Sequence, residues 1–206
     1  MQILVFFRKK NEDENRKKTE PKHRKTSLVS PRTQGRKEAA FPGKYDLIKG
    51  EITMNVMFVC TGNTCRSPMA VSLFTKRLNK EGRSDIQCRS AGLAACEGQG
   101  ASWNAVEACK ELGIDLTYHV AHRLRGGDFM TTDVFVVMEQ VHKDILVGAG
   151  VNPGLVYILG GGIEDPYGKD LDAFIKCRDE IIASLDDLED FLDNRAEEVY
   201  RKMGRN

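Results

Sequence analysis

The stretch NVMFVCTGNTCRSPMAVS (residues 55–72) places a short apolar run directly before a polar loop and a helical pattern. The run NVMFVC is nearly continuous in apolar residues, which is typical of a strand buried on both faces of a sheet. Pro68 suits the first turn of a helix. Apolar residues then recur at helical spacing, at Met69, Ala70, Leu73, Phe74 and Leu78. The stretch therefore predicts a strand ending at Cys60, a tight loop and a helix.

The same alternation of strand and helix continues along the chain. Strand-like runs at 85–92, 133–138 and 155–159 are separated by helical patterns, one of them capped by Ser102. A long amphipathic helix, capped by Asp170, is predicted to continue to Leu192. This pattern predicts a single doubly wound α/β domain at residues 54–206, with a four-stranded parallel sheet flanked by helices.

Charge separates the first 53 residues from the rest. They hold 14 Lys and Arg against 7 Asp and Glu, whereas the remaining residues hold 17 against 23. Dense charge and low hydrophobicity predict a disordered basic N-terminal arm at residues 1–53. A nucleic-acid-binding role for this arm is the non-enzymatic alternative, and we expect no nucleic-acid partner because the predicted domain is net acidic and lacks interleaved aromatic and basic residues.

The six cysteines bear on compartment and metal binding. No CxxC pair is present and no secretory signal is evident, so a reducing, cytoplasmic location is expected, without disulfides, metal or other cofactor. The sequence contains no apolar run of 18 residues, so we expect no membrane span.

The loop after the first strand has the composition of an anion-binding site. Its backbone N–H groups can point inward at the positive end of a helix, and a Gly-Asn pair tolerates left-handed backbone angles. These N–H groups and Arg66 would stabilise a thiolate at Cys60, beneath a phosphate-sized dianion that the Arg66 fork binds. A lone Cys is more often a packed hydrophobe, but the strand before it and the Ser-Pro after Arg66 favour catalysis. The loop consists of Cys60, Thr61, Gly62, Asn63, Thr64, Cys65, Arg66 and Ser67.

A second candidate catalytic residue is Asp165, in GGIEDPYG after the fourth predicted strand. Parallel strands have their carboxyl ends at one edge of the sheet, so Asp165 should lie near Cys60. Pro166 restricts Asp165 to an extended conformation, which helps to aim its side chain. The sequence thus predicts phosphoryl transfer through a thiophosphate on Cys60, with Asp165 first as general acid and then as base.

With CTGNTCRSP and DPYG in view, the chain from about Met54 to Leu192 resembles the low-molecular-weight protein tyrosine phosphatase family. The resemblance implies a phosphorylated protein as substrate, Cys60 as nucleophile, Arg66 as phosphate binder and Asp165 as general acid. It further implies that the loop is braced by hydrogen bonds from Asn63, Ser67, Ser90 and His119.

Thr64 departs from the bulky aliphatic residue, typically Ile, found in members of this family that act on phosphotyrosine, and resembles the family's bacterial protein-arginine phosphatases. A flat polar guanidinium meets a hydroxyl better than an alkyl wall, whereas a phenyl ring favours that wall. We therefore expect phosphoarginine as substrate, with phosphotyrosine as the alternative, and Tyr167 lining the pocket for either.

Three further thiols leave alternatives open. Arsenate reductases share the loop but need a later pair of thiols; Cys88 and Cys96 are candidates, although Cys88 falls in a predicted strand and Pro68 is the phosphatase residue at its position. The resemblance also implies that Cys65 can form a reversible disulfide with Cys60, as a cysteine at this position can in the family. The alternative is that Cys65 is a purely structural thiol.

Overall fold

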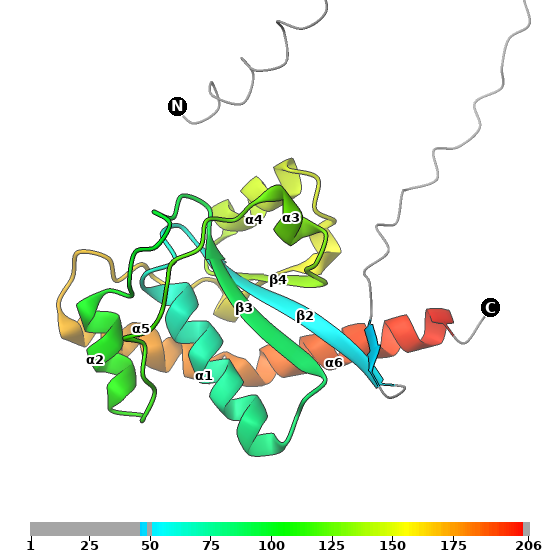
Figure 1. Cartoon of the computed structure of the whole chain (residues 1–206), viewed down its shortest axis with the longest axis horizontal. Coiled ribbons are helices and arrows are strands. Elements are labelled where there is room, and N and C mark those ends of the chain that lie inside the picture. The colour runs from blue at the N-terminus through cyan, green and yellow to red at the C-terminus, as the bar shows by residue number, and fades with distance from the viewer. Residues whose placement is uncertain (1–45, 49–50, 204–206) are drawn as a thin grey trace, which may run out of the picture. The chain divides into compact units, whose positions relative to one another are not determined.

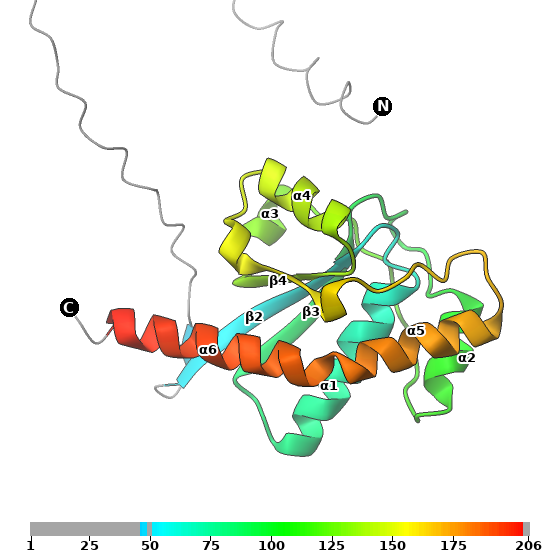
Figure 2. The same ribbon diagram turned by 180° about the vertical axis from the view of Figure 1, so that it is seen from behind.

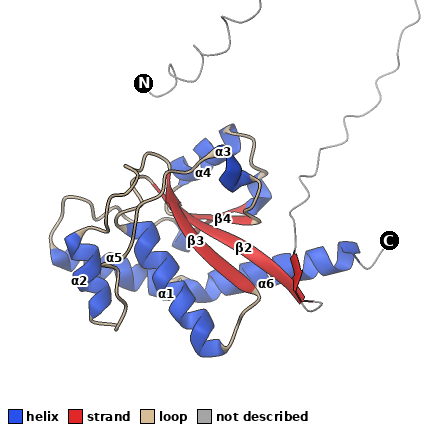
Figure 3. Cartoon of the chain, in the orientation of Figure 1, coloured by secondary structure: helices blue, strands red, loops and turns tan. Residues whose placement is uncertain are grey.

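The sheet contains the four parallel strands that the sequence predicted, and their order is β3-β2-β4-β5 (Figure 1). A short antiparallel strand, β1, pairs with the start of β2. The computed structural model describes the backbone of residues 46–48 and 51–203, all within one unit of the chain that spans residues 41–206. The strands are β1 (Asp46–Ile48), β2 (Glu51–Cys60), β3 (Ile86–Gly92), β4 (Val134–Val137) and β5 (Val156–Ile158). The α-helices are α1 (Arg66–Glu81), α2 (Trp103–Lys110), α3 (Gly126–Phe129), α4 (Gln140–Gly148), α5 (Leu171–Ala183) and α6 (Leu185–Met203), and the 3₁₀ turns are η1 (Pro153–Leu155) and η2 (Leu159–Gly161) (Figure 3).

Strand β2 is buried on both faces because helices cover both sides of the sheet (Figures 1 and 2). Met54, Val56 and Phe58 pack in a cluster with side chains of α1, α2, α5 and α6. Met57 and Val59, which point the other way, pack with Phe135 of β4 and with side chains of α3 and α4. Two buried faces explain why NVMFVC shows no alternation of apolar and polar residues.

At the predicted boundary between arm and domain, the structure describes paired strands on the arm side of Met54. Most of the predicted basic arm lies outside the described residues, but β1 and the first residues of β2 fall within it. Asp46 pairs with Thr53, and Ile48 pairs with Glu51. The folded domain therefore extends further toward the N-terminus than Met54, because two short apolar segments form a hairpin that the average charge of residues 1–53 conceals.

The prediction of a single long C-terminal helix is corrected by the structure. Instead of one long helix, the chain forms α5 and α6, which are separated at Ser184. The Ser184 hydroxyl donates to the carbonyl of Glu180 at 2.8 Å, a contact that bends helices. Gly160, in η2, has φ 59° and lies so close that a Cβ there would be 2.4 Å from the Ser184 hydroxyl.

The predicted caps are present. Ser102 accepts from the N–H of Ala105, Asp170 accepts from the N–H of Ala173, and Gly82 ends α1 with a left-handed φ of 72°. Among the helices that the structure describes, none combines the length and apolar character that crossing a bilayer requires.

Candidate active site

The 60–67 loop connects the carboxyl end of β2 to the start of α1, and Cys60 lies at its base with 3% of its surface exposed. The backbone N–H of Asn63 donates to the Cys60 sulfur at 3.2 Å, and the Ser67 hydroxyl lies 3.0 Å from the same atom. These two contacts hold the sulfur in place at the base of the loop.

Asn63 organises the loop. It is the one described residue other than glycine with a left-handed φ, 55°, and it is fully buried. Its side-chain N–H groups donate to the hydroxyls of Ser67 and Ser90, both at 2.9 Å, and its backbone carbonyl lies 2.7 Å from Nε2 of His119. These are the braces that the family resemblance implied, and they are confirmed. The backbone N–H of His122, which the sequence did not single out, donates to Asn63 Oδ1 at 2.8 Å.

The end of β3 packs directly against this loop. The N–H of Leu93 donates to the Cys60 carbonyl at 2.9 Å, and the N–H of Ala94 donates to the Thr61 carbonyl at 2.8 Å. At Gly92, a Cβ would lie 2.8 Å from both the Asn63 nitrogen and the Thr61 oxygen. Only glycine therefore allows this close approach of two backbones.

Arg66 brings the loop together with distant parts of the chain. Its guanidinium is buried, and Nη2 donates to Oδ2 of Asp165 at 2.6 Å, across 99 residues of sequence. Nη1 donates to the carbonyl of Ile163 at 3.1 Å and to the carboxylate of Glu139. Glu139 follows β4, and the rule that placed Asp165 at this edge of the sheet applies to it equally.

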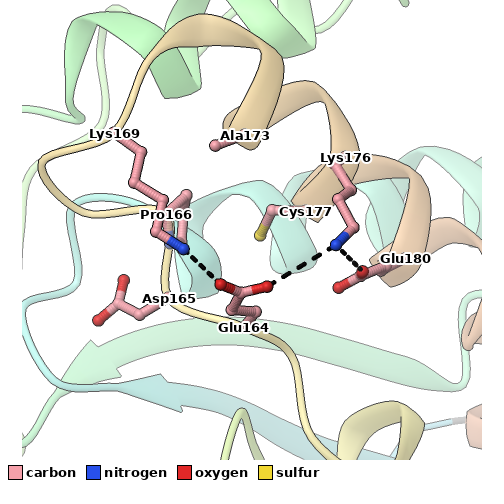
Figure 4. A pocket seen from close by; sticks show the side chains of 8 residues that line it. All are labelled: Glu164, Asp165, Pro166, Lys169, Ala173, Lys176, Cys177 and Glu180. Atoms are coloured by element: carbon pink, nitrogen blue, oxygen red, sulfur yellow. Dashed lines mark hydrogen bonds and ion pairs between the residues drawn. The ribbon is translucent and has the colours of Figure 1, made fainter.

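The loop that carries Asp165 borders a small cavity beneath α5, and Cys177 lies at this cavity (Figure 4). Glu164 forms ion pairs with Lys169 and, at 3.7 Å, with Lys176. Asp165 lies apart from this row of charges (Figure 4). Its Oδ1 accepts the N–H of Tyr167 at 3.1 Å. The ion pairs of its neighbour thus tie this loop to α5, while Asp165 stays free to contact Arg66.

The remaining predicted residues have different environments. Thr64 is buried, and its carbonyl accepts the N–H of Ser102 at 2.8 Å. The Cys65 thiol donates to the Ser102 hydroxyl at 3.4 Å, and burial raises its pKa. Gly62 is partly exposed in the loop, while Tyr167 is 77% exposed.

His142 is a further residue that the sequence did not single out. This buried α4 side chain places Nε2 3.0 Å from the Thr61 hydroxyl. Burial, helped by the charge of Arg66, lowers the pKa of His142, so the ring is neutral near pH 7.

Three cysteines away from the loop, Cys88, Cys109 and Cys177, have environments that disfavour the thiolate. Burial raises the pKa of Cys88 to about 12, of Cys109 to about 11 and of Cys177 to about 12. Cys88 lies within β3, as predicted, and Cys96 is exposed after that strand. A thiol with the pKa of Cys88 is poorly suited to the resolving step of arsenate reduction.

Known proteins show the same architecture and sequence pattern. The model of the low molecular weight phosphotyrosine protein phosphatase family matches residues 55–199. A protein-arginine-phosphatase of Bacillus subtilis (strain 168) is 37% identical over 136 residues, which cover 62% of this chain and 89% of that protein. Arsenate reductase 1 of Staphylococcus epidermidis is 32% identical over 131 residues, covering 64% of this chain and 92% of its own. The crystal structure of a low molecular weight protein tyrosine phosphatase from T. tengcongensis superposes with a TM-score of 0.63 and 38% identity, covering 67% of this chain and 99% of that one.

The matched region contains both the 60–67 loop and the loop of Asp165, and it spans well over half of the sequence. The chain therefore belongs to the low molecular weight phosphotyrosine protein phosphatase family.

Proposed function

We propose that this protein removes phosphoryl groups from phosphoarginine residues of proteins, through a thiophosphate on Cys60. The observation that carries the choice of substrate is Thr64. Its hydroxyl lies near Gly62, where a Cβ would be 3.5 Å away, and 3.6 Å from the Cys65 sulfur, a weak partner. That hydroxyl can accept a hydrogen bond from the substrate guanidinium. The name of the Bacillus subtilis relative, protein-arginine-phosphatase, supports the same substrate.

In the first step, the Cys60 thiolate attacks phosphorus, the sulfur–phosphorus bond forms and the phosphorus–nitrogen bond breaks. The leaving guanidine nitrogen is strongly basic, so it takes a proton from Asp165 as it departs. The loop N–H groups and Arg66 hold the three equatorial oxygens while charge moves from sulfur to nitrogen.

Arg66 also explains how Asp165 acquires its proton. Nη1 is fixed by Glu139 and Ile163, so Nη2 is the part of the guanidinium that can exchange partners. A phosphate dianion in the loop takes over Nη2 from Asp165, and two like charges then lie side by side. Protonation of Asp165 relieves that repulsion and prepares the general acid.

In the second step, Asp165 acts as a base toward a water molecule. The water oxygen attacks the thiophosphate, its proton passes to the carboxylate, and the phosphorus–sulfur bond breaks to give inorganic phosphate and the Cys60 thiolate. Each cycle returns the enzyme to its starting state, because Asp165 gives up one proton and recovers one, and the Cys60 thiolate is regenerated.

Phosphotyrosine is the second candidate substrate. The exposed ring of Tyr167 follows Asp165 by two residues and can stack on a phenyl ring. The relative from T. tengcongensis, of similar identity, is named a protein tyrosine phosphatase. An aromatic wall of this kind serves a phenol leaving group with the same Cys60, Arg66 and Asp165 chemistry.

Replacement of Thr64 tests which substrate the pocket favours. Thr64→Ile should lower kcat/KM for a phosphoarginine peptide about tenfold and raise it several-fold for a phosphotyrosine peptide of the same sequence, since it trades a hydroxyl for an alkyl wall. Thr64→Ser keeps the hydroxyl and should retain the wild-type preference. Equal losses on both peptides in Thr64→Ile would contradict a role for Thr64 in selection.

A further inference from the structure

His122 contacts the active-site loop through its backbone. Its N–H donates to Asn63 Oδ1 at 2.8 Å, and its carbonyl accepts the N–H of Gly92 at 2.8 Å. It therefore connects the end of β3 with the residue that organises the 60–67 loop. The Asn63 side-chain oxygen keeps this partner only while the backbone of residue 122 stays in place. Most residue types at position 122 would supply the N–H, so what matters is how the segment is held.

The side chain of His122 lies between two carboxylates. Nδ1 is 3.1 Å from Glu97, in the loop after β3, and Nε2 is 3.0 Å from Asp128, in α3. A carboxylate accepts hydrogen bonds, and a neutral imidazole has a single N–H to donate. Both contacts can therefore form together only when the ring carries two protons and a positive charge.

The other charged groups around His122 belong to the same cluster. Arg125 pairs with Glu97 at 3.3 Å, and its backbone N–H donates to Asp128 at 2.8 Å. The N–H of Arg123 donates to Glu97 at 3.0 Å. When His122 loses its charge, Glu97 keeps its contacts with Arg123 and Arg125. The imidazole then no longer links Glu97 to Asp128.

We propose that His122 is a positioning residue whose imidazolium clamps the 119–123 segment between Glu97 and Asp128 and thereby holds the His122 N–H on Asn63. Deprotonation releases one of the two carboxylates, loosens the segment and weakens the support of the 60–67 loop. The consequence for catalysis rests on the proposed phosphatase function, whereas the structural coupling does not.

The direction of the pH effect follows from the neighbours. The hydrogen bond to Asp128, followed by that to Glu97, raises the pKa of His122 above its ordinary value of 6.5 despite partial burial. A raised pKa means that the clamp is complete below about pH 6.5 and is lost as the pH rises through the raised value. The side chain is 36% exposed, so solvent screens the pairs and the effect is several-fold rather than large.

Two variants and their pH profiles test the clamp. His122→Arg carries a charge at every pH, and His122→Gln carries none. We expect kcat/KM for p-nitrophenyl phosphate, divided by that of the wild-type chain at the same pH, to rise between pH 5 and 9 by about fivefold for both variants. For His122→Arg the ratio should be near one at pH 5, where the wild-type ring is also charged. For His122→Gln it should be near one at pH 9, where the wild-type ring is also neutral. Ratios that stay flat for both variants would overturn the proposal, because a purely structural role does not depend on the charge.

A nuclear magnetic resonance titration of the full chain separates the clamp from the catalytic function. The side-chain amide signals of Asn63 should move with the same midpoint as the His122 ring in the wild-type chain, and stay still in His122→Arg. If Asn63 follows His122 in a chain that hydrolyses no phosphate ester, the clamp stands and the proposed function falls. If phosphate esters are hydrolysed but the Asn63 amide signals do not change as His122 titrates, the clamp is contradicted and the proposed function stands.

Discussion

Three acceptors surround one buried guanidinium at Arg66: the carboxylates of Asp165 and Glu139 and the carbonyl of Ile163. Two of them bind Nη1 and fix the plane of the fork. Asp165 binds Nη2 alone and is 45% exposed, so it is the partner that solvent or a phosphate can displace. A buried arginine with one exchangeable partner can bind an oxyanion without moving its own side chain.

At this residue scale, Asp165→Asn separates proton transfer from binding. The amide keeps an oxygen for Arg66 but has no proton to give to the leaving group, so kcat should fall by roughly 10²–10⁴ while KM changes little. Steady-state kinetics on a phosphoarginine peptide would measure both. Glu164→Gln is the matched control, because Glu164 pairs with Lys169 and Lys176 rather than with Arg66, and it should stay within about twofold of wild type. A kcat for Asp165→Asn close to that of the control would contradict the acid role.

At the scale of elements, the site depends on how closely the end of β3 approaches the 60–67 loop. The added Cβ of Gly92→Ala would meet backbone atoms of Asn63 and Thr61 at 2.8 Å, and backbone cannot rotate away as a side chain can. The loop must shift, and shifts of this size are costly in preorganised sites. We expect kcat/KM to fall about 100-fold.

Gly100→Ala is the control for that change. A Cβ at Gly100 meets its nearest atom, the His119 carbonyl oxygen, at 4.0 Å, and should leave kcat/KM within about twofold. Thermal unfolding of both variants would show whether Gly92→Ala still folds. A folded Gly92→Ala with wild-type activity would contradict the close packing of β3 on the loop.

At the scale of the whole molecule, the sequence predicted the sheet and the approach of the Asp165 loop to the 60–67 loop, which the contact of Asp165 with Arg66 shows. Both follow from strand–helix alternation, which fixes the carboxyl edge of the sheet. The same rule places Glu139 at this edge. It places every residue that follows a strand there, however, so it does not single out Glu139 as a partner of Arg66. His122 acts on Asn63 through a backbone N–H, which leaves no mark in the sequence.

The sequence did not predict two features of the fold, the break between α5 and α6 and the strand β1. Ser184, which separates α5 from α6, lies close to Gly160 of η2, and helical periodicity alone does not show this contact. Strand β1 gains its stability from pairing with β2, in a region whose average charge predicts disorder. The paired residues of β1 and β2 are close in sequence but lie in a charged segment, whereas Gly160 and Ser184 are distant in sequence, so composition and periodicity do not reveal these contacts.

The most direct test of the account is the side-by-side turnover of two peptides by the full chain. The peptides share one sequence and differ only in carrying phosphoarginine or phosphotyrosine, and Cys60→Ser gives the blank. The account predicts that kcat/KM for phosphoarginine exceeds that for phosphotyrosine by about tenfold or more, and that Cys60→Ser turns over neither. A preference for phosphotyrosine would contradict the assignment that rests on Thr64.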